Sequence, residues 1–125
     1  MKNENDQSSF QEQLYRLDES VALSRVGGDV DLLREIVSLF LDDYPQSLEL
    51  IRQAVAQGDR AGLERHAHSL KGSVSTFGAQ EVFDAAFDLE KQGRSGDLSS
   101  AAPGVARLEK ALSELRPELE ALQSR

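Results

Sequence analysis

Hydrophobic residues recur every three or four positions over most of the chain, a spacing that places them on one face of a helix. The longest stretch with this pattern covers residues 30–57, and similar patterns cover residues 60–76, 79–92 and the region from 103 to the end. Two shorter helical segments are predicted for residues 9–17 and 18–26. Four amphipathic helices joined by short connections favour an all-α fold. We expect an antiparallel up-down four-helix bundle with the short N-terminal segments as a lid.

Turn and capping signals separate the predicted helices. Gly58 and Gly78 are expected to end helices, because glycine tolerates the left-handed backbone found there. Asp29 follows two glycines and is expected to cap the start of the first long helix. Residues 93–97, which include two glycines, are predicted to form a loop.

Two prolines lie inside the predicted helices. Pro45 lacks a backbone donor and clashes with the carbonyl group of Leu41, which predicts a kink there or two abutting helices. Pro117 predicts a bend near the end of the last helix. Residues 1–8 are polar and are expected to form a disordered tail, so that residues 9–125 form a single domain.

Composition agrees with the helical pattern and excludes several classes of function. Leucine and alanine greatly outnumber valine and isoleucine, which favours helices over strands. The chain has no cysteine, so disulfides and thiol chemistry are excluded. Its 14 Lys+Arg and 22 Asp+Glu give a net charge of −8, which argues against nucleic acid as a partner. There is no run of apolar residues long enough to span a membrane and no signal peptide. We therefore expect a cytoplasmic protein, and a monomer because the four apolar helix faces can satisfy one another.

Two histidines are the only side chains suited to act as a nucleophile or base near neutral pH without strong tuning. Helical geometry places His66 roughly 60° from the centre of the apolar face of its helix and His68 roughly 140° from it. His66 is therefore expected to be a packed boundary residue, and His68 to point outward. Residues two apart face away from each other on a helix, and no matching Glu-x-x-His motif accompanies Glu64 and His68, so no metal site is expected.

The neighbours of His68 make an incidental surface histidine the weaker interpretation. Lys71, Gly72, Arg65 and Ser75 share its exposed face. A glycine inside a helix costs about 0.5–1 kcal/mol relative to alanine, so its presence needs a reason. Space beside an exposed imidazole and a nearby positive charge are what a histidine needs to take up and hold a phosphoryl group.

The run Ala67-His68-Ser69-Leu70-Lys71-Gly72-Ser73 resembles the A-H-x-L-K-G-S signature of histidine-containing phosphotransfer (HPt) domains. The resemblance extends over about residues 18–122. Its further positions are Gly27-Gly28-Asp29, Phe40-Leu41, Gly58-Asp59, Phe77-Gly78-Ala79 and Leu89-Glu90.

The resemblance implies a phosphorelay intermediate that takes a phosphoryl group from a receiver-domain aspartate onto His68 and passes it to another receiver. It implies that Lys71 supplies a positive charge and that Gly72 leaves room for the phosphoryl group. Glu90 matches a position where the family places a polar group near the imidazole, and its carboxylate can accept the ring N–H. No cofactor of the chain itself is expected, because the receiver would supply Mg²⁺. The candidates for docking the receiver, besides Glu90, are Arg65, Ser75, Leu41, Leu14 and Leu17, although core packing is an equal alternative for the three leucines.

Three other interpretations are weighed. A purely structural bundle would leave Gly72 unexplained. Kinase activity is not expected, because the chain has no glycine-rich phosphate loop and no room for a nucleotide domain. A phosphoacceptor domain cut from a larger chemotaxis-type or hybrid histidine kinase would have a similar bundle and motif. A start at Met1 and a complete final helix favour a stand-alone relay protein.

Overall fold

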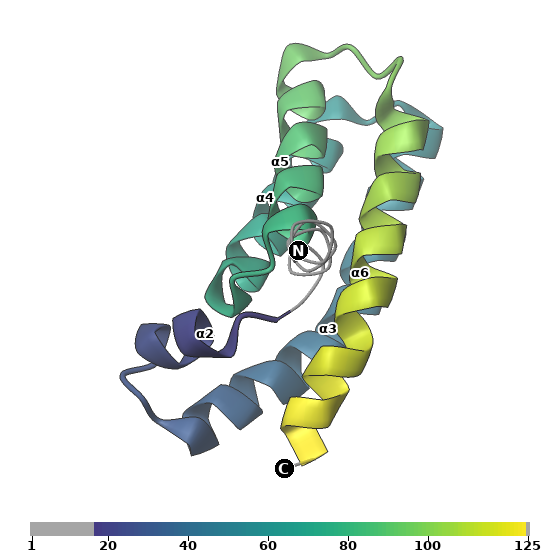
Figure 1. Ribbon diagram of the computed structural model, residues 1–125. Helices are drawn as coiled ribbons and strands as arrows, with labels where there is room; N and C mark the ends of the chain where they lie inside the picture. Colours follow the sequence, from purple (N-terminus) through teal and green to yellow (C-terminus); the bar gives the residue numbers. More distant parts are fainter. Residues whose placement is uncertain (1–16, 125) are drawn as a thin grey trace, which may run out of the picture.

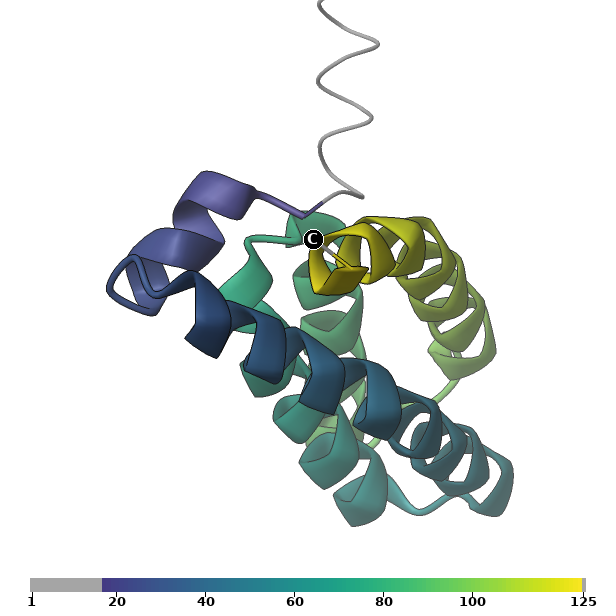
Figure 2. The ribbon, with the colours of Figure 1, turned by 90° about the horizontal axis from the view of Figure 1, so that it is seen from below.

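The computed structural model describes residues 17–124, and within this range the chain forms helices and turns without strands. The elements are α2 (Glu19–Arg25), α3 (Val30–Gln57), α4 (Arg60–Val74), the 3₁₀ turn η1 (Ser75–Phe77), α5 (Gln80–Ser95) and α6 (Ala101–Ser124). The four long helices lie alongside one another (Figures 1 and 2). Each of them packs against its neighbour in the chain, and α6 closes the bundle against α3. The predicted all-α four-helix bundle is confirmed.

The helix ends follow the sequence signals. The carboxylate of Asp29 accepts a hydrogen bond of 3.0 Å from the backbone N–H of Leu32 at the start of α3. Gly58 ends the same helix with a positive φ of 68°, and Gly78 follows η1 with a φ of 66°. A residue with a Cβ would be strained in either place, because the left-handed region suits glycine.

One of the two alternatives expected at Pro45 is wrong. Helix α3 is continuous through Pro45, so the chain does not form two abutting helices there. A proline removes only one hydrogen bond from a helix of 28 residues, and the buried Tyr44 and Leu48 hold both sides of it in the same core. Helix α6 also continues past Pro117, and the bend expected near its end stays a prediction.

The predicted loop at residues 93–97 is also wrong in its first part. Helix α5 continues to Ser95, and the connection to α6 begins at Gly96. Gly93 is buried in the helix rather than placed in a turn. Its reason is packing, described below, and packing contacts of this kind override a weak helix propensity.

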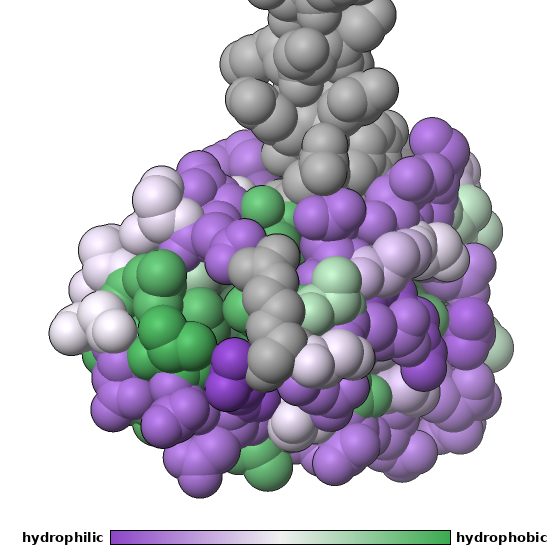
Figure 3. Space-filling view, turned by 60° about the horizontal axis from the view of Figure 1, so that its bottom comes forward, coloured by the Kyte–Doolittle hydropathy of each residue, from purple (hydrophilic) through white to green (hydrophobic). Residues whose placement is uncertain are grey.

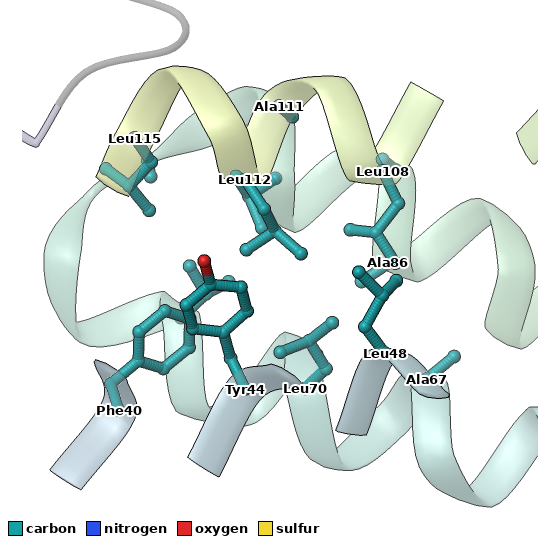
Figure 4. Packing of buried hydrophobic residues seen from close by; sticks show 14 of the residues in the cluster. Phe40, Tyr44, Leu48, Ala67, Leu70, Ala86, Leu108, Ala111, Leu112 and Leu115 are labelled. Carbon is teal, nitrogen blue, oxygen red and sulfur yellow. The ribbon is translucent and has the colours of Figure 1, made fainter. Parts of the chain in front are cut away.

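The core lies between the four helices and is built mainly from leucine and alanine (Figure 4). Phe40 stacks on Tyr44 with ring centroids 5.3 Å apart and meets Phe77 edge-on at 5.2 Å. The Tyr44 hydroxyl accepts a hydrogen bond of 2.9 Å from the Arg116 guanidinium at the rim. Close packing against the neighbouring helices fixes the rotation of each long helix about its own axis. This rotation decides which of its residues face the core and which face outward.

Helix α2 lies across one end of the bundle and is tied to the end of α4 (Figure 1). The backbone N–H of Asp18 donates a 2.9 Å hydrogen bond to the carbonyl of Phe77, and the Arg25 guanidinium donates to the carbonyl of Ser75. The expected lid is therefore present in the part of it that the structure describes. Leu14, the tail at residues 1–8 and most of the segment at 9–17 lie outside the described residues. In the described range, no helix is long and apolar enough to cross a membrane.

Candidate functional site

His68 lies on the outward face of α4, as the helical geometry predicts. Its side chain is 66% exposed, whereas Ala67 and Leu70, which point inward, are buried. His66 is half-buried at the boundary of the core, which confirms its predicted place.

The two ring nitrogens of His68 have different surroundings. Nδ1 lies 3.0 Å from Oε2 of Glu90, a residue of the neighbouring helix α5 whose side chain is only 4% exposed. A carboxylate can only accept, so Nδ1 is the nitrogen that carries the proton. Nε2 is then the nitrogen whose lone pair is free to act as a nucleophile.

Two cations hold the Glu90 carboxylate on its other sides. The Lys71 ammonium lies 2.9 Å from Oε1, outside ordinary hydrogen-bond geometry, so charge rather than a directed hydrogen bond holds this oxygen. The Arg94 guanidinium donates a 2.7 Å hydrogen bond to Oε2, the oxygen that His68 also contacts. A second donor of Arg94, Nε, binds Glu64 on α4 at 2.9 Å. The site is thus a network of charged groups across α4 and α5.

These contacts decide the charge of Glu90. Burial on its own raises the pKa of a carboxyl group, but the contacts with Lys71 and His68 outweigh it and lower the pKa of Glu90 below its usual value. Glu90 is therefore a carboxylate at neutral pH, and it can stabilise positive charge on the imidazole ring.

Lys71 is more enclosed than its place on the helix suggests. Its side chain is 18% exposed, and its ammonium lies 4.4 Å from the ring centroid of Phe87 and 5.8 Å from that of Phe83. The aromatic faces and Glu90 hold the ammonium in one place beside His68.

Gly93 allows α5 to come close enough for Glu90 to reach His68. A Cβ at this position would lie 2.6 Å from the backbone nitrogen of Glu64 and 2.8 Å from the carbonyl oxygen of Arg60. Only a residue without a side chain fits against the α4 backbone there.

Gly72 differs from Gly93, because none of the described residues fills the space beside it. It is exposed, and an added Cβ would meet no atom within 4 Å. Packing within the chain therefore does not explain a glycine in the last turns of α4.

The proposed docking residues have mixed surroundings. Arg65 is exposed and makes no ion pair with another described residue. Ser75 lies in η1 rather than in α4, and its hydroxyl donates a 2.7 Å hydrogen bond to the carbonyl of Gly72. Leu41 and Leu17 are half-buried and pack against the core.

The sequence analysis missed two features of this region. Arg94 was not singled out, although Glu90 four residues before it was a signal for an ion pair on one helix face. Leu32 and Leu39 are 40% and 61% exposed, and their positions off the core face of α3 were a signal for an exposed apolar surface. Figure 3 shows such an apolar area on the side of the molecule where α2 and the start of α3 lie.

The described residues contain no group of three or more His, Cys, Asp or Glu side chains placed to hold a metal ion. A helical bundle with an outward, exposed histidine whose Nδ1 contacts a buried carboxylate has the features that a histidine phosphoacceptor requires.

Comparison with known proteins agrees with this class. The model of the Hpt domain matches residues 35–123, so the chain belongs to the Hpt domain family. The crystal structure of histidine-containing phosphotransfer protein B (HptB) from Pseudomonas aeruginosa PAO1 superimposes with a TM-score of 0.80 at 27% identity, over 87% of this chain and 95% of that one. The Hpt domain of an Hpt sensor hybrid histidine kinase from Shewanella shares the fold, with a TM-score of 0.71 at 22% identity over 89% and 93% of the two chains. No curated protein matches the chain.

The chain is thus a phosphotransfer intermediate of phosphorelays. Hpt domains exchange phosphoryl groups with receiver domains and carry no kinase domain of their own.

Proposed function

We propose that His68 is the residue that is phosphorylated, at Nε2, by an aspartyl phosphate of one receiver domain, and that it passes the group to the aspartate of a second receiver. The observation that supports this most directly is the contact of Nδ1 with buried Glu90, which leaves Nε2 of an exposed ring as the nucleophile.

The step follows from these contacts. The Nε2 lone pair attacks phosphorus, the bond between phosphorus and the aspartate oxygen breaks, and the aspartate leaves as a carboxylate. The ring keeps its Nδ1 proton and becomes positively charged, because both nitrogens are then substituted. Glu90 lies 3.0 Å from that proton and neutralises the new charge. Transfer to the second receiver is the reverse of the same step.

Lys71 and Gly72 are assigned supporting roles. The Lys71 ammonium, held between Glu90 and the Phe87 ring, places a positive charge beside the incoming phosphoryl oxygens. Gly72 lies one helical turn from His68 and leaves the space that an approaching receiver loop requires.

We assign receiver docking to the surface around His68. Arg65 contributes an exposed positive charge there, and the exposed Leu32 and Leu39 nearer the start of α3 are further candidates for apolar contact with the receiver. Leu41, Leu17 and Ser75 remain candidates for contact with the receiver, and so does Leu14, which lies outside the described residues. The receiver would supply the Mg²⁺ that neutralises the transferring oxygens, and we further propose that the chain acts as a monomer in the cytoplasm, without autokinase activity.

Incubation with a ³²P-labelled phospho-receiver tests the proposal. Wild type is expected to take up label that acid removes, and His68→Gln is expected to take up none. His66→Gln is the matched control, because His66 lies two residues away on the same helix and has no contact with Glu90. Equal labelling of His68→Gln and wild type would contradict the assignment, as would a wild type that stays unlabelled with a panel of phospho-receivers.

A further inference from the structure

Arg94 extends the contacts of His68 through Glu90 to Glu64. Glu64 and His68 are four residues apart on α4, and Glu90 and Arg94 are four residues apart on α5. Arg94 joins the two acidic groups, with 2.9 Å from Nε to Glu64 and 2.7 Å from Nη2 to Glu90. None of the roles assigned above explains why the chain places this arginine there.

Arg94 and His68 contact the same oxygen of Glu90, Oε2. Arg94 reaches this oxygen from the direction of the α5 C-terminus, and His68 reaches it from α4. Lys71 holds only the other oxygen, Oε1. Arg94 is therefore the contact besides His68 itself that holds Oε2, the oxygen in line with the Nδ1–H group, whereas Lys71 pulls on Oε1.

We propose that Arg94, anchored by Glu64, is a positioning residue for phosphotransfer: it fixes the orientation of the Glu90 carboxylate and thereby holds the His68 ring with its proton on Nδ1. This inference rests on the proposed role of His68. Its chemical consequence is direct, because an imidazole that carries its proton on Nε2 has no lone pair there to attack phosphorus. Arg94 therefore acts on the reaction through Glu90 without touching the phosphoryl group.

A merely structural role for Arg94 is the competing explanation. Arg94 lies in the last turn of α5, where a cation stabilises a helix, and its side chain is 56% exposed. Under that explanation, its removal would lower stability slightly and leave the His68 ring unchanged. A suitable test therefore measures the tautomer of the His68 imidazole ring directly.

The test uses ¹⁵N NMR of the imidazole nitrogens in the full chain, at a pH where the ring is neutral, together with the rate of phosphorylation by phosphoramidate. This small phosphodonor reports the reactivity of His68 without receiver docking. In Arg94→Gln, the ratio of the Nδ1–H to the Nε2–H form of His68 is expected to fall by roughly two- to tenfold, the worth of one hydrogen bond. The phosphorylation rate is expected to fall in proportion to the Nδ1–H fraction that remains. Arg94→Lys, which keeps the charge on Glu90, is expected to restore part of both.

Arg52→Gln is the matched control. Arg52 is similarly exposed and also binds two carboxylates, Glu49 on its own helix and Glu109 on α6, but it has no contact with His68 or Glu90. It should change neither the tautomer ratio nor the rate. His66 provides an internal reference signal in every sample.

An Arg94→Gln protein whose His68 tautomer ratio equals that of wild type or of Arg52→Gln would overturn the inference. The NMR result does not depend on phosphorylation. If the wild type takes no phosphoryl group while the tautomer responds to Arg94, the proposed function fails and the positioning of the ring by Arg94 stands.

Discussion

The difference between the two nitrogens of His68 comes from one residue on another helix. Glu90 is almost fully buried, and a buried carboxylate is stable only when positive or hydrogen-bonding groups surround it. Lys71, Arg94 and His68 supply these contacts. The same contacts stabilise the buried charge and engage Nδ1 of His68, so that Nε2 is the nitrogen left for the phosphotransfer we propose.

Gly72 allows stability and function to be separated by one substitution. Gly72→Ala is expected to raise the free energy of unfolding by about 0.5–1 kcal/mol, because alanine is the better helix former and the added methyl group meets no atom. The same methyl group occupies space needed by a receiver, so phosphotransfer from a phospho-receiver is expected to slow.

Urea unfolding and transfer kinetics on the same preparations measure the two effects. Ala61→Gly on the exposed face of the same helix is a control for helix propensity, since it should lower stability without slowing transfer. A Gly72→Ala protein that transfers at the wild-type rate would remove the steric role of this glycine.

At the scale of the helices, the pair α4 and α5 carries the site. His68, Lys71 and Glu64 come from α4, and Glu90 and Arg94 come from α5. The distance between the two backbones therefore decides whether the network forms, and Gly93 is the point of closest approach.

Gly93→Ala is expected to force the two helices apart, because its Cβ would meet backbone atoms of Glu64 and Arg60 that have no rotamer to change. Overpacking of this kind costs about 1–3 kcal/mol of stability. The contact between Glu90 and His68 should weaken with it.

Thermal unfolding and the ¹⁵N signals of the His68 ring measure the two effects of Gly93→Ala. Gly72→Ala is the opposite control, because it makes the same chemical change where space is open. Equal stability of the two variants would contradict the close approach at Gly93.

The stability of the whole molecule is expected to fall in acid partly through Glu90. The pKa of Glu90 is lower in the folded protein than in the unfolded chain, because its contacts with Lys71 and His68 outweigh the opposing effect of burial. A carboxyl group of this kind contributes stability at pH values above its unfolded pKa, and the contribution is lost as the pH falls through the lower folded pKa. Glu90→Gln should therefore lose less stability than wild type as the pH falls below the pKa of a glutamate in the unfolded chain and on through the lower folded pKa of Glu90.

Urea unfolding at a series of pH values provides the measurement. Asp42→Asn, which removes an exposed carboxylate of α3, is the control and should follow the wild-type curve. Parallel curves for wild type and Glu90→Gln would show that the charge of Glu90 contributes nothing to the acid sensitivity.

The sequence predicted the architecture and the outward direction of His68, because both depend on hydrophobic periodicity within single helices. It predicted Glu90 only through the family resemblance, since the contact joins residues 22 positions apart on two helices. It failed at Gly93, and at Pro45 in so far as two abutting helices were expected there, because packing from neighbouring helices outweighed the local preference of one residue. It did not predict the role of Arg94, because the two partners of this residue lie on different helices.

The placement of Glu90 on the Nδ1 side of His68 also bears on how long a phosphorylated molecule persists. Hydrolysis of a phosphohistidine is accelerated when a base beside the phosphorus activates water. In the described part of the chain, the carboxylate that contacts the ring lies on the opposite edge from Nε2 and is held there by Lys71 and Arg94. The phosphorylated protein should therefore hydrolyse slowly after it leaves the first receiver. It then has time to diffuse to the second receiver.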